Sequence, residues 1–219
     1  MLSRIAATVV PSLGHLTVTS DHATAPAAGS IIVANHTSLV DPGVVLAALR
    51  RLGVEPVVMA TAGLWRIPVL GRLLERGGHV PVHRHTDRAA AALDVAALAL
   101  GAGRHLLIYG EGRLPCRTDA GEAPPESFRS GLARLAHVSG APVVPLGQAG
   151  ARRVSSGSCV KQISGFLTAP ARRPRLHVHI GAPLHLPPEI GAATVAARAA
   201  VTAAWRTAAD RIGEPAASD

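Results

Sequence analysis

Short apolar runs and helical patterns alternate along most of the chain. The runs are rich in Val, Ile and Leu, which is typical of strands buried in a sheet. The predicted strands are residues 16–20, 31–34, 56–60, 80–82, 104–109, 142–146 and 175–180. The predicted helices, from apolar residues at helical spacing, are residues 42–51, 64–74, 86–102, 128–139 and 188–212. This alternation predicts an α/β fold, in which residues 1–219 form one domain with a mostly parallel central sheet flanked by helices.

Three segments depart from this alternation. Pro68 and Gly71 interrupt the helical pattern of residues 64–74, which predicts a kinked or two-part helix. Residues 110–127 are rich in Gly, Pro and charge and predict a long loop, and a loop of that length inside a compact domain is usually functional or mobile. Residues 147–174 are predicted to be irregular.

The composition narrows the class of partner. The formal net charge is +8 at pH 7, and Lys161 is the one lysine, so arginine carries almost all of the positive charge. This favours anionic partners, namely phosphorylated small molecules, a phospholipid surface or nucleic acid. Arginine in particular suits bidentate binding of phosphate. The sequence has no nucleic-acid recognition module, basic helical stripe or interleaved aromatic residues, so no nucleic-acid partner is expected.

Cysteine usage and apolar run lengths bear on the compartment. Cys116 and Cys159 fit no disulfide framework, so a reducing, cytoplasmic location is expected. No apolar run reaches the ~18 residues of a membrane span. Residues 1–14 predict either a small amphipathic helix that rests on a bilayer or an ordinary packing helix, so peripheral contact with the inner face of the plasma membrane stays open.

Two groups of histidines are conceivable metal ligands. His79, His83 and His85 could share one face of an extended segment, and His177 and His179 could do so on another strand. No Cys or carboxylate completes a ligand spacing in either group, so no metal site is expected.

The stretch from Ile31 to Pro42 carries the first candidate site. A β-branched apolar run breaks abruptly into Asn-His-Thr-Ser, and Asp41 lies five positions after His36. A strand that delivers a histidine and a carboxylate to one turn can present a general base together with the group that orients it. Pro42 suits the first turn of the helix that follows. The alternative is structural: Asp41, with Ser38, would cap that helix, and His36 would be an ordinary loop residue.

Three further blocks follow in order. Residues 78–84 are Gly-His-Val-Pro-Val-His-Arg, residues 109–112 are Tyr-Gly-Glu-Gly, and residues 141–146 are Ala-Pro-Val-Val-Pro-Leu. Together with Asn-His-x4-Asp at residues 35–41, these blocks resemble the lysophospholipid acyltransferase family, the 1-acylglycerol-3-phosphate O-acyltransferase-like enzymes. The family's second and third blocks are Gly-x-Ile/Val-x-Val-x-Arg and Phe-Pro-Glu-Gly. The resemblance covers about residues 15–185 and implies the same α/β fold.

The resemblance implies acyl transfer from acyl-CoA or acyl-carrier protein to a hydroxyl of a lysophospholipid, with no further cofactor. His36 would be the general base that takes the hydroxyl proton, and Asp41 would fix its tautomer. Arg84 would bind the phosphate of an anionic lipid acceptor. The other substrate-binding residues that the resemblance implies are Asn35, Ser38, Glu111, Gly112 and Arg113.

The third block departs from the family pattern. Gly110 stands where the family has Pro, Arg113 where it has Thr, and Leu114 where it has a phosphate-binding Arg. Arg113 or Arg117 could supply that charge from a neighbouring position. Two alternatives therefore stay open, namely acyl transfer to a different acceptor, such as an amino-lipid or a secondary metabolite, and a lipid-binding domain without turnover.

Overall fold

The protein is built on one mixed sheet. The computed structural model describes residues 1–83, 88–114 and 121–214. Within these ranges seven strands form a sheet in the order β1-β7-β6-β2-β5-β3-β4. All neighbouring strands are parallel except β6 and β7, which are antiparallel. The strands are β1 (His15–Ser20), β2 (Ile31–Ala34), β3 (Val57–Thr61), β4 (Val80–Val82), β5 (Leu106–Tyr109), β6 (Val143–Ala149) and β7 (Arg175–Ile180).

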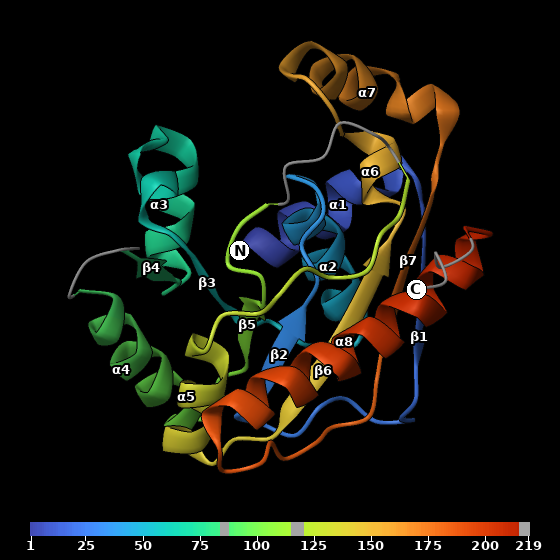
Figure 1. Cartoon of the computed structure of the whole chain (residues 1–219). Coiled ribbons are helices and arrows are strands. Elements are labelled where there is room, and N and C mark those ends of the chain that lie inside the picture. Colours follow the sequence, from blue (N-terminus) through green and yellow to red (C-terminus); the bar gives the residue numbers. More distant parts are fainter. Residues whose placement is uncertain (84–87, 115–120, 215–219) are drawn as a thin grey trace.

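Helices cover both faces of the sheet (Figure 1). Those of the described ranges are α1 (Leu2–Leu13), α2 (Asp41–Arg51), the 3-10 helix η1 (Ala62–Arg66), α3 (Pro68–Arg76), α4 (Arg88–Gly101), α5 (Gly131–Ser139), α6 (Ala151–Val154), α7 (Cys159–Arg172) and α8 (Ile190–Ile212). Ile32 and Ala34 of β2 pack with α1 and α2, whereas Ile31 and Val33 pack with α4, α5 and α8. The alternation of side chains along β2 therefore supplies one core on each face of the sheet.

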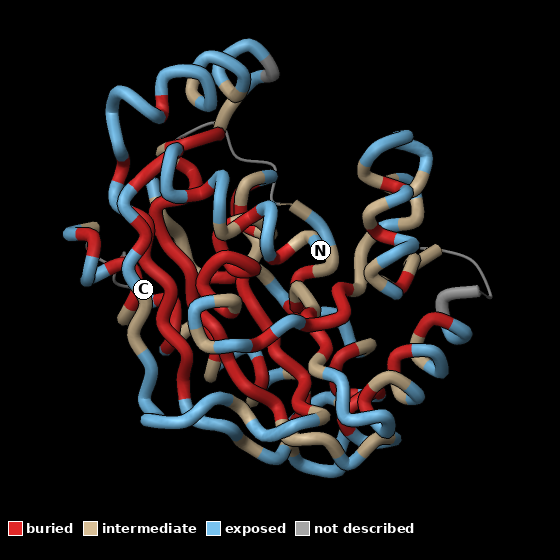
Figure 2. Tube along the Cα trace, turned by 180° about the vertical axis from the view of Figure 1, so that it is seen from behind, coloured by how far each residue is buried: buried red, intermediate tan, exposed pale blue. Residues whose placement is uncertain are grey.

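The central strand β2 positions the candidate site. All four of its residues are fully buried, which explains why it is an uninterrupted apolar run rather than an alternating one (Figure 2). It lies between β5 and β6, with Ala34 in register with Tyr109 on one side and Leu146 on the other. The chain that leaves β2 therefore emerges beside the carboxyl ends of two neighbouring strands.

The predicted fold class and most of the predicted elements are confirmed, with boundaries that shift by a few residues. The pattern at residues 64–74 folds as two helices, η1 and α3, and Pro68 begins the second. The helix predicted from Phe128 begins instead at Gly131. The final helix, predicted over 188–212, is α8.

The prediction that residues 147–174 are irregular is wrong. β6 continues to Ala149, and α6 and α7 occupy most of the segment between β6 and β7. The sequence does not indicate α7 clearly because Gly165 and Pro170, two residues that usually interrupt a helix, lie within it. A Gly-Ser cluster just before it also resembles a loop, although Ser158 accepts a hydrogen bond from the backbone N–H of Lys161 as the N-cap.

The N-terminal segment forms an ordinary packing contact. Ala6, Val10 and Leu13 of α1 are buried in the core cluster that also contains α2. Ile5 and Val9, at the edge of this buried side, are each 42% exposed. Over the described ranges, no helix has both the length and the apolar character needed to cross a membrane.

Candidate active site

The turn between β2 and α2 brings His36 and Asp41 together. His36 Nδ1 lies 3.0 Å from Asp41 Oδ2. The same carboxylate oxygen accepts the backbone N–H groups of Thr37 at 2.5 Å and Ser38 at 2.8 Å. Three donors converge on one buried oxygen, and hydrogen bonds to an ionised acceptor are about twice as strong as neutral ones. The turn is therefore wound around the Asp41 carboxylate.

Asp41 does not cap α2, in contrast to the structural alternative for this residue. Val40 is the N-cap residue, and Asp41 is the first residue of the helix, followed by Pro42. Its carboxylate turns back toward the preceding turn instead of toward the helix. A negative charge in the first helical turn is also favoured by the helix dipole.

Two neighbours fix the ring of His36: one stacks on its face and the other contacts a ring nitrogen. It stacks on the ring of Tyr109, with the centroids 4.3 Å apart and the planes 29° from parallel. Because Nδ1 faces the carboxylate of Asp41, that nitrogen carries the proton in the neutral ring and Nε2 carries the lone pair. Nε2 has no hydrogen-bond partner in the part of the chain that the structure describes, and the side chain is 16% exposed. This geometry leaves Nε2 available to a substrate.

A buried polar network holds the turn against β6. Asn35 Nδ2 donates to the backbone oxygen of Gln148 at 3.0 Å, and the backbone N–H of Gln148 donates to Asn35 Oδ1 at 2.8 Å. Gln148 Nε2 donates to Thr37 Oγ1, and Arg152 Nη1 donates to the backbone oxygen of Thr37. Asn35 is fully buried, so its polar atoms tie two strands together.

The hydroxyl of Ser38 also makes its hydrogen bonds within the protein. It donates to the backbone oxygen of Ser155 at 2.7 Å and accepts the backbone N–H of Val40. Asn35 and Ser38, both predicted to bind substrate, thus use their side chains to position the turn between β2 and α2. Sequence reasoning misses Gln148 and Ser155 as their partners, and Arg152 as the partner of Thr37, since contacts across more than a hundred residues leave no local pattern.

Glu111 places a second carboxylate beside the histidine. Its Oε1 accepts the backbone N–H of His36 at 3.2 Å, and its Oε2 is buried without a hydrogen-bond partner among the described residues. Burial raises the pKa of Glu111 to about 7, and the negative charges of Asp41 and Glu126 add to the rise, against the lowering effect of its N–H donors. A neutral Glu111 avoids a second buried charge next to Asp41.

In the third block, the departure from the family pattern at Gly110 has a packing cause. A Cβ at this position would lie 2.4 Å from the ring of Phe128, so the ring fills the space that a larger residue would need. Gly112 has φ +67°, a conformation that glycine adopts without strain. Arg113 is exposed and pairs with Glu126 at 3.2 Å.

The side chain of Glu122 bonds to two other parts of the protein. Its Oε1 accepts the backbone N–H of Gly150 at 2.8 Å, and its Oε2 accepts the indole N–H of Trp205 at 3.1 Å. Burial raises the pKa of Glu122. Arg84, the predicted phosphate ligand, and Arg117 lie outside the described residues.

The histidines considered as metal ligands have other partners. Nδ1 of His79 accepts the backbone N–H of Val58, and burial lowers the pKa of His79 to about 4. His177 and His179 contact threonines of β1. His85 lies outside the described residues, and among those described no three His, Cys, Asp or Glu side chains form a group that could hold a metal ion.

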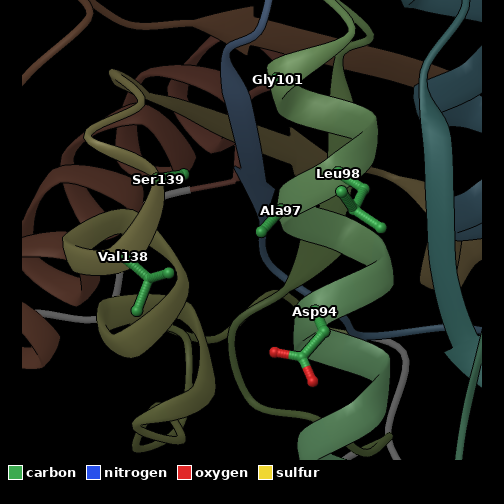
Figure 3. A pocket seen from close by; sticks show the side chains of 6 residues that line it. All are labelled: Asp94, Ala97, Leu98, Gly101, Val138 and Ser139. Carbon is green, nitrogen blue, oxygen red and sulfur yellow. The ribbon is translucent and has the colours of Figure 1, made fainter.

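A depression between α4 and α5 is separate from the turn between β2 and α2 (Figure 3). Its lining residues are Asp94, Ala97, Leu98, Gly101, Val138 and Ser139. None of them is a candidate site residue, and the lining is mainly apolar.

A histidine held by a carboxylate lies at the carboxyl end of a central strand of this α/β fold, an arrangement that suits acid–base chemistry. The Acyltransferase family model matches residues 15–148. The chain belongs to this family and is an acyltransferase, which confirms the predicted membership.

A particular relative shares the fold. The chain is similar to the 1-acyl-sn-glycerophosphate (LPA) acyltransferase PlsC from Thermotoga maritima, with a TM-score of 0.69 and 18% identity, over 96% of this chain and 78% of that chain. No curated protein sequence matches.

Proposed function

We propose that this acyltransferase moves a fatty acyl group from acyl-CoA or acyl-carrier protein to the hydroxyl of a lysophospholipid of the 1-acylglycerol-3-phosphate type, in phospholipid biosynthesis. The observation that carries the proposal is the 3.0 Å contact between His36 Nδ1 and Asp41 Oδ2. The family match to residues 15–148 supports acyl transfer, and the likeness to PlsC, a 1-acyl-sn-glycerophosphate acyltransferase, suggests the acceptor.

In this mechanism His36 Nε2 takes the proton of the acceptor hydroxyl as its oxygen attacks the thioester carbonyl carbon. A C–O bond forms, the tetrahedral intermediate collapses, and the C–S bond breaks. The imidazolium returns the proton to the departing thiolate, so no acyl-enzyme forms. Asp41 stabilises the imidazolium and holds the tautomer with Nε2 unprotonated.

The acceptor phosphate would be held by arginine. Arg84 is the proposed ligand from its place in the second block. Arg113, which is exposed and lies two residues after Glu111, would contribute a second positive charge. Gly112 would let the backbone approach the acceptor closely. These contacts would orient the hydroxyl toward His36.

Turnover of defined acceptors tests the proposal. Thiol release from acyl-CoA and from acyl-carrier protein is measured with lysophosphatidate, an amino-lipid and no acceptor. His36→Ala should lower release by about 10²- to 10⁴-fold, the usual contribution of a general base. His137→Ala, at an exposed position of α5, is the matched control and should act like the wild type. Equal release by wild type and His36→Ala would refute the assignment of the base, and release with the amino-lipid alone would refute the acceptor.

A further inference from the structure

Helix α7 turns its apolar side away from the protein. Val160, Ile163, Phe166 and Leu167 are between 43% and 76% exposed. They recur at three- and four-residue spacing and so share one side of the helix. In Figure 2 the tube of α7 is exposed along most of its length. Amphipathic helices of globular proteins normally place their apolar side against the core, whereas α7 exposes this side to solvent.

The opposite side of α7 is fastened to α6. A Cβ at Gly165 would lie 2.6 Å from the backbone oxygen of Val154, so the glycine permits a close approach, and Ala169 is fully buried. The guanidinium of Arg172 donates to the backbone oxygens of Gly165 at 2.7 Å and Arg153 at 2.9 Å. The helix cannot roll its apolar side inward without breaking these contacts.

Helix α6, to which α7 is fastened, also holds the proposed catalytic turn, the turn between β2 and α2 that carries His36. Arg152 of α6 donates to the backbone oxygen of Thr37, and Ser38 donates to Ser155 directly after α6. Leu39, inside the same turn, is 65% exposed. Figure 1 shows α7 at the end of the molecule to which β2 and β6 point, the end that carries the catalytic turn.

The charges around the apolar side of α7 indicate which kind of partner surface it fits. Residues 127–188 contain no Asp or Glu, whereas Lys161, Arg172 and Arg173 lie on α7 or directly after it. Basic side chains that flank an apolar stripe are the pattern of a helix that lies in a lipid interface. A second copy of a chain with net charge +8 would repel this basic surface, and an anionic bilayer would attract it.

We propose that α7 docks the enzyme on an anionic lipid bilayer. Val160, Ile163, Phe166 and Leu167 enter the boundary between headgroups and acyl chains, and Lys161 contacts lipid phosphates. The docked helix holds the His36 turn at the surface from which a lipid acceptor arrives. This last step rests on the proposed function, but the docking itself does not.

Vesicle sedimentation of the full chain tests the docking. The vesicles are phosphatidylcholine with about a third phosphatidylglycerol, or phosphatidylcholine alone. Wild type should bind the anionic vesicles more tightly, and Ile163→Ser/Leu167→Ser should weaken that binding by about tenfold or more, because two apolar side chains no longer leave water. Leu98→Ser/Val138→Ser, at exposed apolar positions of the depression in Figure 3, is the matched control and should bind like the wild type.

A second variant reports the location of α7 directly. Phe166→Trp should add a blue-shifted tryptophan signal on vesicle binding, beyond any change that Trp65 and Trp205 give in the wild type. The docking is overturned if wild type does not bind anionic vesicles, if the α7 variant binds equally well, or if Phe166→Trp adds no shift. It is also overturned if the α7 variant instead converts a dimer to a monomer in solution with vesicle binding unchanged.

Turnover of a short-chain, monomeric lysophosphatidate separates this inference from the proposed function. The α7 variant should keep wild-type turnover there and lose it on vesicles. Loss on the monomeric acceptor would show that the substitutions damage the site and would overturn the docking role. A His36→Ala enzyme that keeps its turnover would refute the catalytic proposal and leave the vesicle result standing.

Discussion

Removing the charge of Glu111 should change how the stability of the protein depends on pH. The folded protein raises the pKa of this carboxyl from its ordinary 4.5 to about 7, chiefly by burial. Between these pH values the folded protein holds a proton that the unfolded chain has released. The contribution of this group to stability is therefore fully present below about pH 4.5 and is lost as pH rises through about 7.

The pKa gap sets the size of the effect. At about 1.4 kcal/mol per pH unit, a rise from 4.5 to about 7 costs the ionised wild type about 3 kcal/mol of unfolding free energy. About 2.5 kcal/mol of this falls between pH 5 and pH 8. Glu111→Gln keeps an oxygen that can accept the N–H of His36 but does not titrate. The variant should therefore gain stability relative to the wild type by that amount over this range.

Urea unfolding followed by circular dichroism at pH 5, 6, 7 and 8 measures the difference between the two proteins. Other titrating groups are common to both and cancel in that difference. Glu75→Gln, at an exposed position of α3, is the control. Its unfolding free energy should differ from that of the wild type by the same amount at every pH. A difference between Glu111→Gln and wild type that changes by less than about 0.5 kcal/mol, or that shrinks as pH rises, would refute the raised pKa and its burial origin.

Three further variants test the packing of the site, each by urea unfolding. Gly147→Ala should lose about 3 kcal/mol, because its Cβ would lie 2.1 Å from the backbone carbon of Ala204 in α8; unchanged stability would contradict this close contact. Tyr109→Phe should gain about 1 kcal/mol, because the lost hydroxyl is buried with no hydrogen-bond partner in the described ranges; a loss would reveal a partner. Asn35→Ala should lose about 3 kcal/mol, because it leaves the buried backbone N–H and C=O of Gln148 without hydrogen-bond partners. A loss below about 1 kcal/mol would argue against that pairing.

The sequence predicts the sheet well because burial leaves a local signature. The run Ile31–Ala34 is apolar at every position, as a strand covered on both faces must be. The change from this run to a polar turn and then to Pro42 also indicates the candidate catalytic pair. Such features need only neighbouring residues, and neighbouring residues are what a single sequence displays.

Features that depend on distant partners could not be predicted. The sequence assigns Asn35 to the substrate because nothing nearby shows that Gln148 takes both of its amide atoms. It leaves Asp41 open as a helix cap because the turn of this carboxylate toward His36 depends on the path of the chain between them. At α7 the prediction failed for a local reason, since Gly165 and Pro170 are residues that usually interrupt a helix.

The contacts between β1 and β7 bear on the order in which the chain can fold. β1 is an edge strand that pairs with β7 alone, about 160 residues later. Thr17 Oγ1 lies 2.7 Å from His177 Nδ1, and Thr19 Oγ1 lies 2.9 Å from both His177 Nε2 and His179 Nδ1. A slip by one residue would break every one of these contacts, so the register is fixed by polar side chains. During synthesis β1 leaves the ribosome before β2 to β6, and its partner β7 follows them all, so closure of this edge is a late, high-contact-order step.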